Sequence, residues 1–297
     1  MWQHERSRKA TIREKTEGKI PLSNTKKTAR RAARVAAVVG TALGLTLSLS
    51  ASASAHSVYE SDTQWHNSAG DHCLLNKSQV DDDSNVGGKF QGWAESGYNE
   101  IIPFVDCEFP RERPANHLAA GMQIWKWSVD QWVLCTRTDK TYYNTSPTFS
   151  LNVYANSPSS GMCGPGTYGV FYHAAMHSDG GWTPTFNNPL WSGYHTGLGR
   201  AGVTAGIDKM EKPAWVTDSG TVDPEKLPDS VQVVDADGNL VLDDAGQPVA
   251  VSPLLPAPED SASADAERGS EKRNLVTRDG SVTEEVEATM VHVAETL

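Results

Sequence analysis

The chain has 297 residues, with 26 Lys and Arg against 37 Asp and Glu, and a formal net charge of −11 at pH 7. This length is enough for one or two folded domains. The excess of negative charge repels phosphate backbones and anionic lipid headgroups, so the sequence predicts no nucleic-acid partner and no attachment to a membrane surface.

The N-terminal segment has the features of a secretory signal peptide. Residues 1–34 hold eleven basic and three acidic residues, a net charge of 11 − 3 = +8, and residues 35–49 are apolar and uncharged. Ala53-Ser54-Ala55 follows as a small-residue cleavage site, which predicts a signal peptide over residues 1–55. A transmembrane anchor is the alternative, but the apolar run is shorter than the roughly 18–20 residues that cross a bilayer.

Removal of residues 1–55 changes the net charge to −11 − 8 = −19. The expected mature protein is extracellular and has no membrane span. All four cysteines lie in it, and an even number of cysteines in an exported chain indicates disulfides. Four cysteines allow three pairings, of which we favour the sequential one, Cys73–Cys107 and Cys135–Cys163.

Residues 56–212 form the expected folded domain, because they hold seven of the nine tryptophans and every Phe and Tyr. Gly121–Cys135 is predicted to be one long central strand with Trp125, Trp127, Val133 and Cys135 on its apolar face. Thr148–Ala155, Thr167–His177 and Leu190–Leu198 are further predicted strands. Short strands separated by turn residues indicate an all-β fold, either an antiparallel sandwich or a small barrel, with two disulfides.

Residues 213–297 differ in composition from the rest. They contain no Cys, Phe or Tyr, and their charge is 5 − 18 = −13. So little apolar surface predicts a largely disordered acidic tail. Three segments, 233–242, 241–251 and 275–286, place turn residues between aliphatic ones and predict short hairpins, which are marginal alone and gain stability from a partner. Glu284–Leu297 is an alternative candidate for a terminal helix.

Candidate metal ligands are few, and no cofactor is expected. His173 and His177 share a strand face, but four residues of strand span about 13 Å, too far for one ion, so we expect both to face solvent. Asp81, Asp83 and Asn85 offer oxygen ligands, so calcium is an alternative to an ordinary turn there. The glycine and glutamate of an EF-hand loop are missing. The sequence therefore assigns no metal site.

No motif for nucleophilic, phosphate-binding or redox chemistry occurs, so no catalytic residue is assigned. The distinctive feature is the aromatic content of residues 56–212. Aromatic side chains beside turn residues are candidates to stack on sugars or to anchor a protein interface, although filling the core is the alternative. The predicted ligand-binding residues are Trp182, Asn187, Asn188, Trp191 and Tyr194.

The sequence thus favours a secreted, non-enzymatic module that binds a glycan or a protein outside the cell. Two alternatives stay open. One is a subunit of a larger extracellular assembly, such as a toxin particle or surface layer, whose tail docks on a partner. The other is a secreted hydrolase without a recognisable motif.

Overall fold

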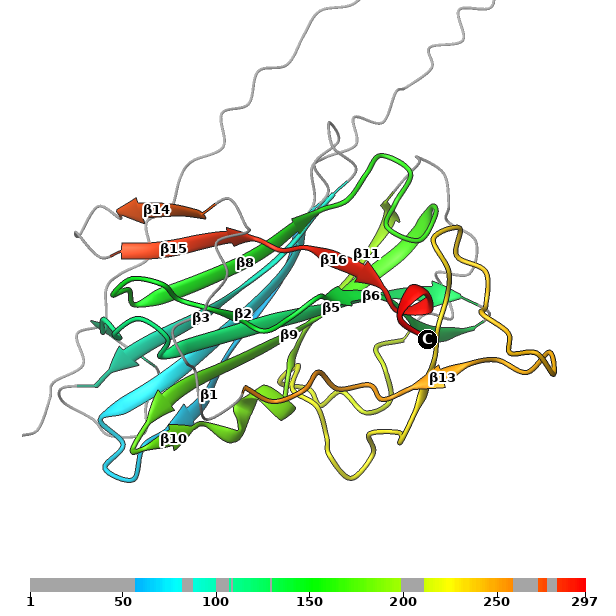
Figure 1. Cartoon of the computed structure of the whole chain (residues 1–297). Coiled ribbons are helices and arrows are strands. Elements are labelled where there is room, and N and C mark those ends of the chain that lie inside the picture. The colour runs from blue at the N-terminus through cyan, green and yellow to red at the C-terminus, as the bar shows by residue number, and fades with distance from the viewer. Residues whose placement is uncertain are drawn as a thin grey trace, which may run out of the picture. The chain divides into compact units, whose positions relative to one another are not determined.

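The computed structural model in Figure 1 describes residues 57–81, 88–99, 107, 109–128, 130–198, 211–258, 272–276 and 282–297. The predicted signal peptide, Asp83 and Asn85 lie outside these residues. The described chain is built from β-strands and short 3₁₀ turns, which confirms the all-β prediction. Among the described segments, none forms a helix long and apolar enough to cross a bilayer.

The first sheet contains seven strands. Six of them follow the order β1 (Ser57–His66), β2 (His72–Asp81), β3 (Lys89–Tyr98), β8 (Ser150–Asn156), β15 (Val282–Glu287) and β14 (Lys272–Val276), and β4 (Phe109–Pro110) also pairs with β3. The pairs are antiparallel except for β8 and β15, which run parallel.

The second sheet also has seven strands. Its order is β10 (Gly181–Trp182), β9 (Gly166–Ser178), β5 (Leu118–Ser128), β6 (Gln131–Thr138) and β16 (Met290–His292), with β11 (Leu190–Leu198) on β9 and β7 (Tyr142–Tyr143) on β5. The short strands β12 (Val231–Gln232) and β13 (Ala250–Val251) form a separate pair.

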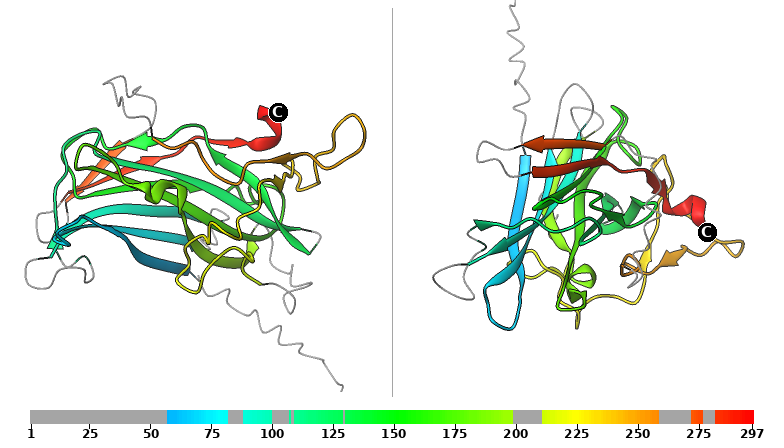
Figure 2. Two further views of the ribbon diagram at one scale, coloured as in Figure 1. Left: turned by 90° about the horizontal axis from the view of Figure 1, so that it is seen from below. Right: turned by 60° about the vertical axis from the view of Figure 1, so that its left-hand side comes forward.

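The two sheets pack face to face and neither closes into a barrel. Their shared core contains Leu74, Phe90 and Leu151 from the first sheet and Ile124 and Tyr172 from the second. Figure 2 shows the blue and cyan strands of the first sheet beside the green strands of the second. The alternation of β9 is confirmed, since the predicted inward residues all join this core: Tyr168, Val170, Tyr172, Ala174 and Met176.

The predicted long central strand is wrong, because residues 118–138 form a hairpin. The chain turns between Ser128 and Gln131, and Asp130 has φ of 59°. Aspartate tolerates this left-handed conformation better than most residues, so the turn needs no glycine. Ile124 and Val133 join the core between the sheets, whereas Trp125, the neighbour of Ile124, points to the opposite face of its sheet and packs in a second cluster.

Two disulfides cross-link the fold in the favoured sequential pairing. Cys73 bonds Cys107, and Cys135 bonds Cys163. The second bond ties β6 to the loop that precedes β9. Disulfides of this kind persist in oxidising compartments, which fits an extracellular protein.

The predicted boundary at residue 212 and the predicted disorder beyond it are wrong for the described part of the tail. Residues 51–297 form one compact unit. β15 extends the first sheet and β16 extends the second, and Val286 and Val293 are fully buried. The tail has no Phe or Tyr and only one tryptophan, Trp215, but it adds its aliphatic side chains to a core that the rest of the chain supplies. Glu284–Leu297 forms strands and a 3₁₀ turn (Val293–Thr296), not a helix.

The hairpins predicted in the tail are present. Val234 bridges Leu240 across a turn that contains Gly238 at φ of 85°, and Leu242 bridges Pro248 across the next turn. β14 and β15 pair antiparallel as the third hairpin. This third hairpin is stabilised by the chain's own first sheet, because β15 pairs with β8.

Candidate functional site

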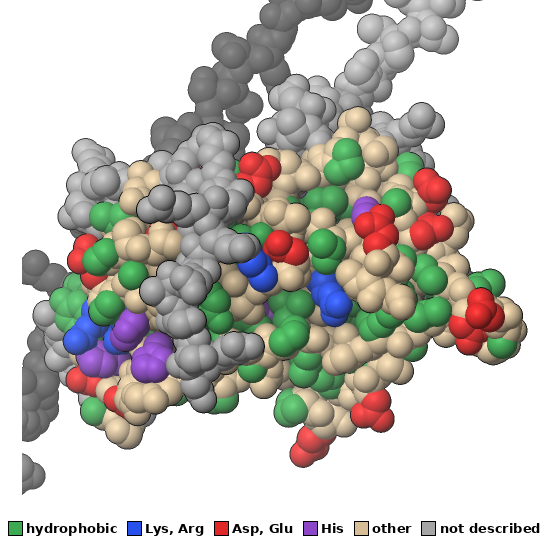
Figure 3. Space-filling view, in the orientation of Figure 1, with side chains coloured by type: hydrophobic (Ala, Val, Ile, Leu, Met, Phe, Trp, Pro, Cys, Tyr) green, Lys and Arg blue, Asp and Glu red, His purple; other side chains and the backbone are tan. Residues whose placement is uncertain are grey.

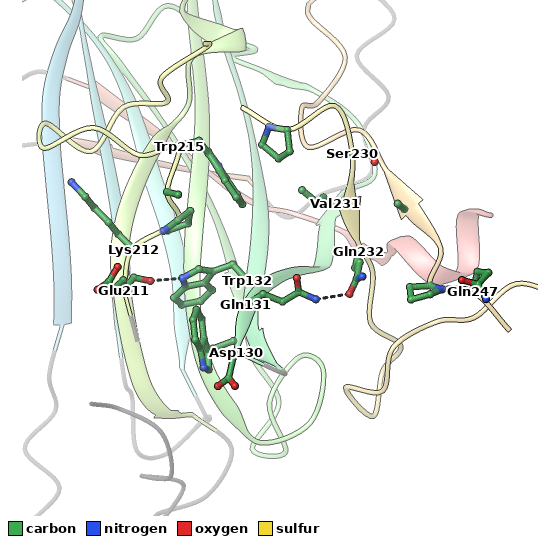
Figure 4. A pocket seen from close by; sticks show the side chains of 16 residues that line it. Asp130, Gln131, Trp132, Glu211, Lys212, Trp215, Ser230, Val231, Gln232 and Gln247 are labelled. Carbon is green, nitrogen blue, oxygen red and sulfur yellow. Dashed lines mark hydrogen bonds between the residues drawn. The ribbon is translucent and has the colours of Figure 1, made fainter. Parts of the chain in front are cut away.

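A pocket of about 720 Å³ opens beside the turn between β5 and β6. Its other walls come from the segment after β11 and from the β12–β13 region (Figure 4). This volume lies within the range typical of sites for small ligands. The lining residues are Trp127, Asp130, Gln131, Trp132, Glu211, Lys212, Pro213, Ala214, Trp215, Pro228, Ser230, Val231, Gln232, Gln247, Pro248 and Ala250.

Three tryptophans give the pocket its aromatic surface. Trp127 and Trp132 are directly opposite each other on β5 and β6, with ring centroids 5.4 Å apart in an edge-to-face arrangement. Trp132 is only 6% exposed and forms a floor, whereas Trp127 and Trp215 are half-buried. Trp215 packs on Trp125 at 5.9 Å. The β5–β6 hairpin therefore positions the rings of Trp127 and Trp132, and the tail contributes the ring of Trp215.

A second layer of aromatic side chains holds this floor in place. The ring of Trp191 lies 4.9 Å from that of Trp132 and 4.7 Å from that of Phe171. Trp191 fits there because position 169 is glycine: an added Cβ would lie 2.1 Å from its ring. Close packing on both sides restricts the rotamer of Trp132, so the pocket floor is preorganised.

Three glutamines, Gln131, Gln232 and Gln247, supply amide groups to the pocket lining. The indole N–H of Trp132 donates to the carbonyl oxygen of Glu211 at 2.7 Å, and Gln131 donates to the side chain of Gln232 (Figure 4). Gln247 lines the far wall. These hydrogen bonds link the hairpin to the tail segments that close the pocket.

The charge of the lining does not favour an anionic ligand. Asp130 and Glu211 are exposed carboxylates. The one cation in the described lining, Lys212, is 2.7 Å from Asp218 and also donates to the carbonyl of Thr217. Since the cation is already paired and two acids remain, the pocket disfavours an anionic ligand.

The structure separates the ligand-binding residues predicted from the sequence. Trp191 is only 2% exposed, so the prediction that it is displayed at the surface is wrong. β11 pairs with β9, and the ring of Trp191 packs in the aromatic layer behind the pocket. Tyr194 is half-buried, with its ring 5.8 Å from Trp132. Both residues support the pocket and do not line it.

Trp182 lies in a different cluster. It is half-buried on β10, with its ring 5.5 Å from His177 and 5.7 Å from Tyr143. Asn187 is exposed at the end of the 3₁₀ turn Pro184–Asn187, and the backbone oxygen of Asn188 accepts a hydrogen bond from Gln64. The predicted residues therefore do not form one site.

The expectation that His173 faces solvent is also wrong. His173 is fully buried under the 3₁₀ turn, and its Nδ1 lies 2.7 Å from the carbonyl oxygen of Phe186. Burial lowers the pKa of His173 to about 4, with the hydrogen bond to Phe186 acting in the opposite direction. The imidazole of His173 is therefore neutral and has a structural role in the protein interior.

The oxygen-rich segments behave as turns where they are described. Asp235 accepts hydrogen bonds from the backbone N–H groups of Asp237 and Asn239, and the bond from Asn239 is the main cause that lowers its pKa. Asp81 is the last residue of β2.

Cys135, Cys163 and His292 bring their side-chain ligand atoms within 4.8 Å of one another, but the two sulfurs are bonded to each other and offer no thiolate.

Comparisons with protein-family models, with curated proteins and with solved structures give no match. The pocket had one signal in the sequence, the dense tryptophans of residues 125–132. Treating that stretch as one strand hid the pairing of Trp127 with Trp132. Trp215 gave no usable signal, because its position depends on how the tail folds back.

Proposed function

We propose that this protein is a secreted, non-enzymatic module that binds a neutral glycan in the pocket of Trp127, Trp132 and Trp215. The observation that supports this best is the presence of three indole rings and three glutamine side chains in the lining of one open pocket. The two disulfides fit a working place outside the cell.

The chemistry of the lining matches that of a sugar ring. The C–H face of a pyranose is apolar and packs on an indole ring, whereas its hydroxyl groups need hydrogen-bond partners. Gln131, Gln232 and Gln247 supply amide donors and acceptors at the rim. Asp130 and Glu211 accept hydrogen bonds from hydroxyls and repel carboxylate or phosphate groups on a ligand.

The alternatives from the sequence have less support. The described tail strands β15 and β16 pair with β8 and β6 of the same chain, so their backbone groups are engaged on those sides. A hydrolase with two carboxyls needs one that is held protonated, usually by burial. Asp130 and Glu211, the two acids of the described lining, are both exposed.

The test is retention of the protein on a panel of insoluble neutral polysaccharides, compared with a charged one. We expect retention on a neutral polymer, and loss of it in Trp215→Ala. Trp182→Ala is the matched control, because Trp182 is equally half-buried and lies outside the pocket lining. If neither the panel nor soluble oligosaccharides bind, or if the two variants behave alike, the proposal is wrong.

A further inference from the structure

His117 and His177 face each other across the β5–β9 pair. Leu118 is registered with Met176, and the backbone N–H of His177 donates to the carbonyl of His117 at 2.9 Å. The imidazole centroids are 5.0 Å apart, with an angle of 68° between the ring planes. Figure 3 shows histidine side chains gathered beside basic ones near the left edge of the view.

We propose that His117 and His177 together bind a late first-row divalent cation, such as Zn²⁺ or Ni²⁺. Residues directly opposite in an antiparallel pair have Cβ atoms about 4.5–5.5 Å apart. Imidazole nitrogens bind these ions at about 2.0–2.1 Å, so two rings from such a pair reach one ion after small side-chain rotations. The remaining coordination positions stay open to water or to a ligand.

The surroundings of the pair orient its rings. A hydrogen bond joins the His117 ring to the backbone of His177, which leaves the other ring nitrogen for a metal. This is the arrangement that fixes the tautomer of ligating histidines in proteins. The ring of Trp182 packs edge-on against His177 at 5.5 Å. Both histidines are half-buried, so fewer side-chain conformations are lost on binding.

Neighbouring charges decide which cations suit the site. The positive charge of Arg113 interacts with His117 and opposes any cation there. Arg111 and Asp179 interact in turn with Arg113, Arg111 as a like charge and Asp179 as an opposite one. Calcium and magnesium are held by oxygen ligands and net negative charge, which the pair does not provide. Ions bound through imidazole depend more on the donor nitrogens, so Zn²⁺ and Ni²⁺ fit better.

The test is calorimetric titration of the full-length chain, without a histidine tag, with Zn²⁺ and separately with Ni²⁺. We expect saturable binding of one ion, weakened about tenfold or more in His117→Gln and in His177→Gln. His292→Gln is the control, since His292 is also half-buried and lies beside the Cys135–Cys163 disulfide. Absence of saturable binding, or binding that both pair variants retain, would overturn the proposal.

A measurement on the unaltered protein avoids dependence on the folding of the variants. Imidazole resonances of His117 and His177 should both shift during the Zn²⁺ titration, and chelator should restore them. If other histidines shift and these two do not, the proposed pair is not the site. Ca²⁺ at the same concentration should leave both resonances unchanged.

Discussion

The carboxylate of Glu284 accepts hydrogen bonds from both the backbone N–H and the hydroxyl of Thr145, at 2.9 and 2.7 Å. It also accepts bonds from the N–H and hydroxyl of Ser146, each at 3.2 Å. Glu284 is 1% exposed and lies on β15. A buried acid from the C-terminal strand therefore holds the loop that leads into β8, and this makes the tail part of the fold.

Removing this carboxylate should destabilise the protein strongly. Glu284→Ala leaves the N–H groups of Thr145 and Ser146 without their acceptor, and we expect the free energy of unfolding to fall by about 3 kcal/mol. Urea denaturation measures this change. Glu285→Ala, on the next and more exposed position of the same strand, should cost less than about 0.5 kcal/mol. Equal losses in the two variants would show that the hydrogen bonds contribute little.

A chain that ends at Lys212 should not fold into a stable domain. It would keep both disulfides but lose the buried residues Val233, Val286 and Val293 and the strands beside β8 and β6. We expect loss of near-ultraviolet circular dichroism and of a cooperative melting transition. The full chain is the control. A truncated protein that melts cooperatively, with native aromatic signals, would restore the domain boundary predicted from the sequence.

Two glycines should respond differently to the same substitution. In Gly169→Ala the added Cβ would lie 2.1 Å from the ring of Trp191, so the aromatic layer must move, at a cost of about 1–3 kcal/mol. In Gly181→Ala the added Cβ meets no atom within 4 Å. Thermal melting should show a clear decrease only for the first variant. A similar melting temperature for both would mean that the ring yields easily.

The protonation of His173 should make the folded protein less stable as the pH is lowered. Its folded pKa of about 4 lies below the unfolded value of 6.5, so the unfolded chain binds the proton first. The contribution is complete above pH 6.5 and decreases as the pH falls toward 4, by about 3 kcal/mol. Urea midpoints between pH 7 and 4 measure it, and His173→Gln should reduce the slope. An unchanged slope would assign the dependence to other groups.

Tryptophans in the pocket and behind it should have separable effects. Trp127→Ala removes a half-buried pocket wall, so affinity for a bound neutral oligosaccharide should fall about tenfold with little change in stability. Trp191→Ala empties a buried position and should lower the free energy of unfolding by about 3–5 kcal/mol. Titration and urea denaturation of both variants distinguish the two roles. A Trp191→Ala protein of normal stability would contradict the packing described here.

The sequence by itself determined the features that depend on local periodicity and turn chemistry. The inward face of Thr167–His177 follows from a side-chain period of two, which any strand obeys. The hairpin around Gly238 follows from turn residues that lie next to each other in the chain. The favoured pairing of the cysteines in their order along the chain is confirmed as well.

Only the tertiary structure decided which distant residues meet. The turn at Asp130 lacks glycine, so the hairpin that pairs Trp127 with Trp132 was hidden, and with it the pocket. The place of Glu284 and the pairing of His117 with His177 depend on strand register between segments far apart in the chain. Register is fixed by the summed packing of whole faces and by closure of long loops, and neither quantity can be obtained from a local pattern of residues.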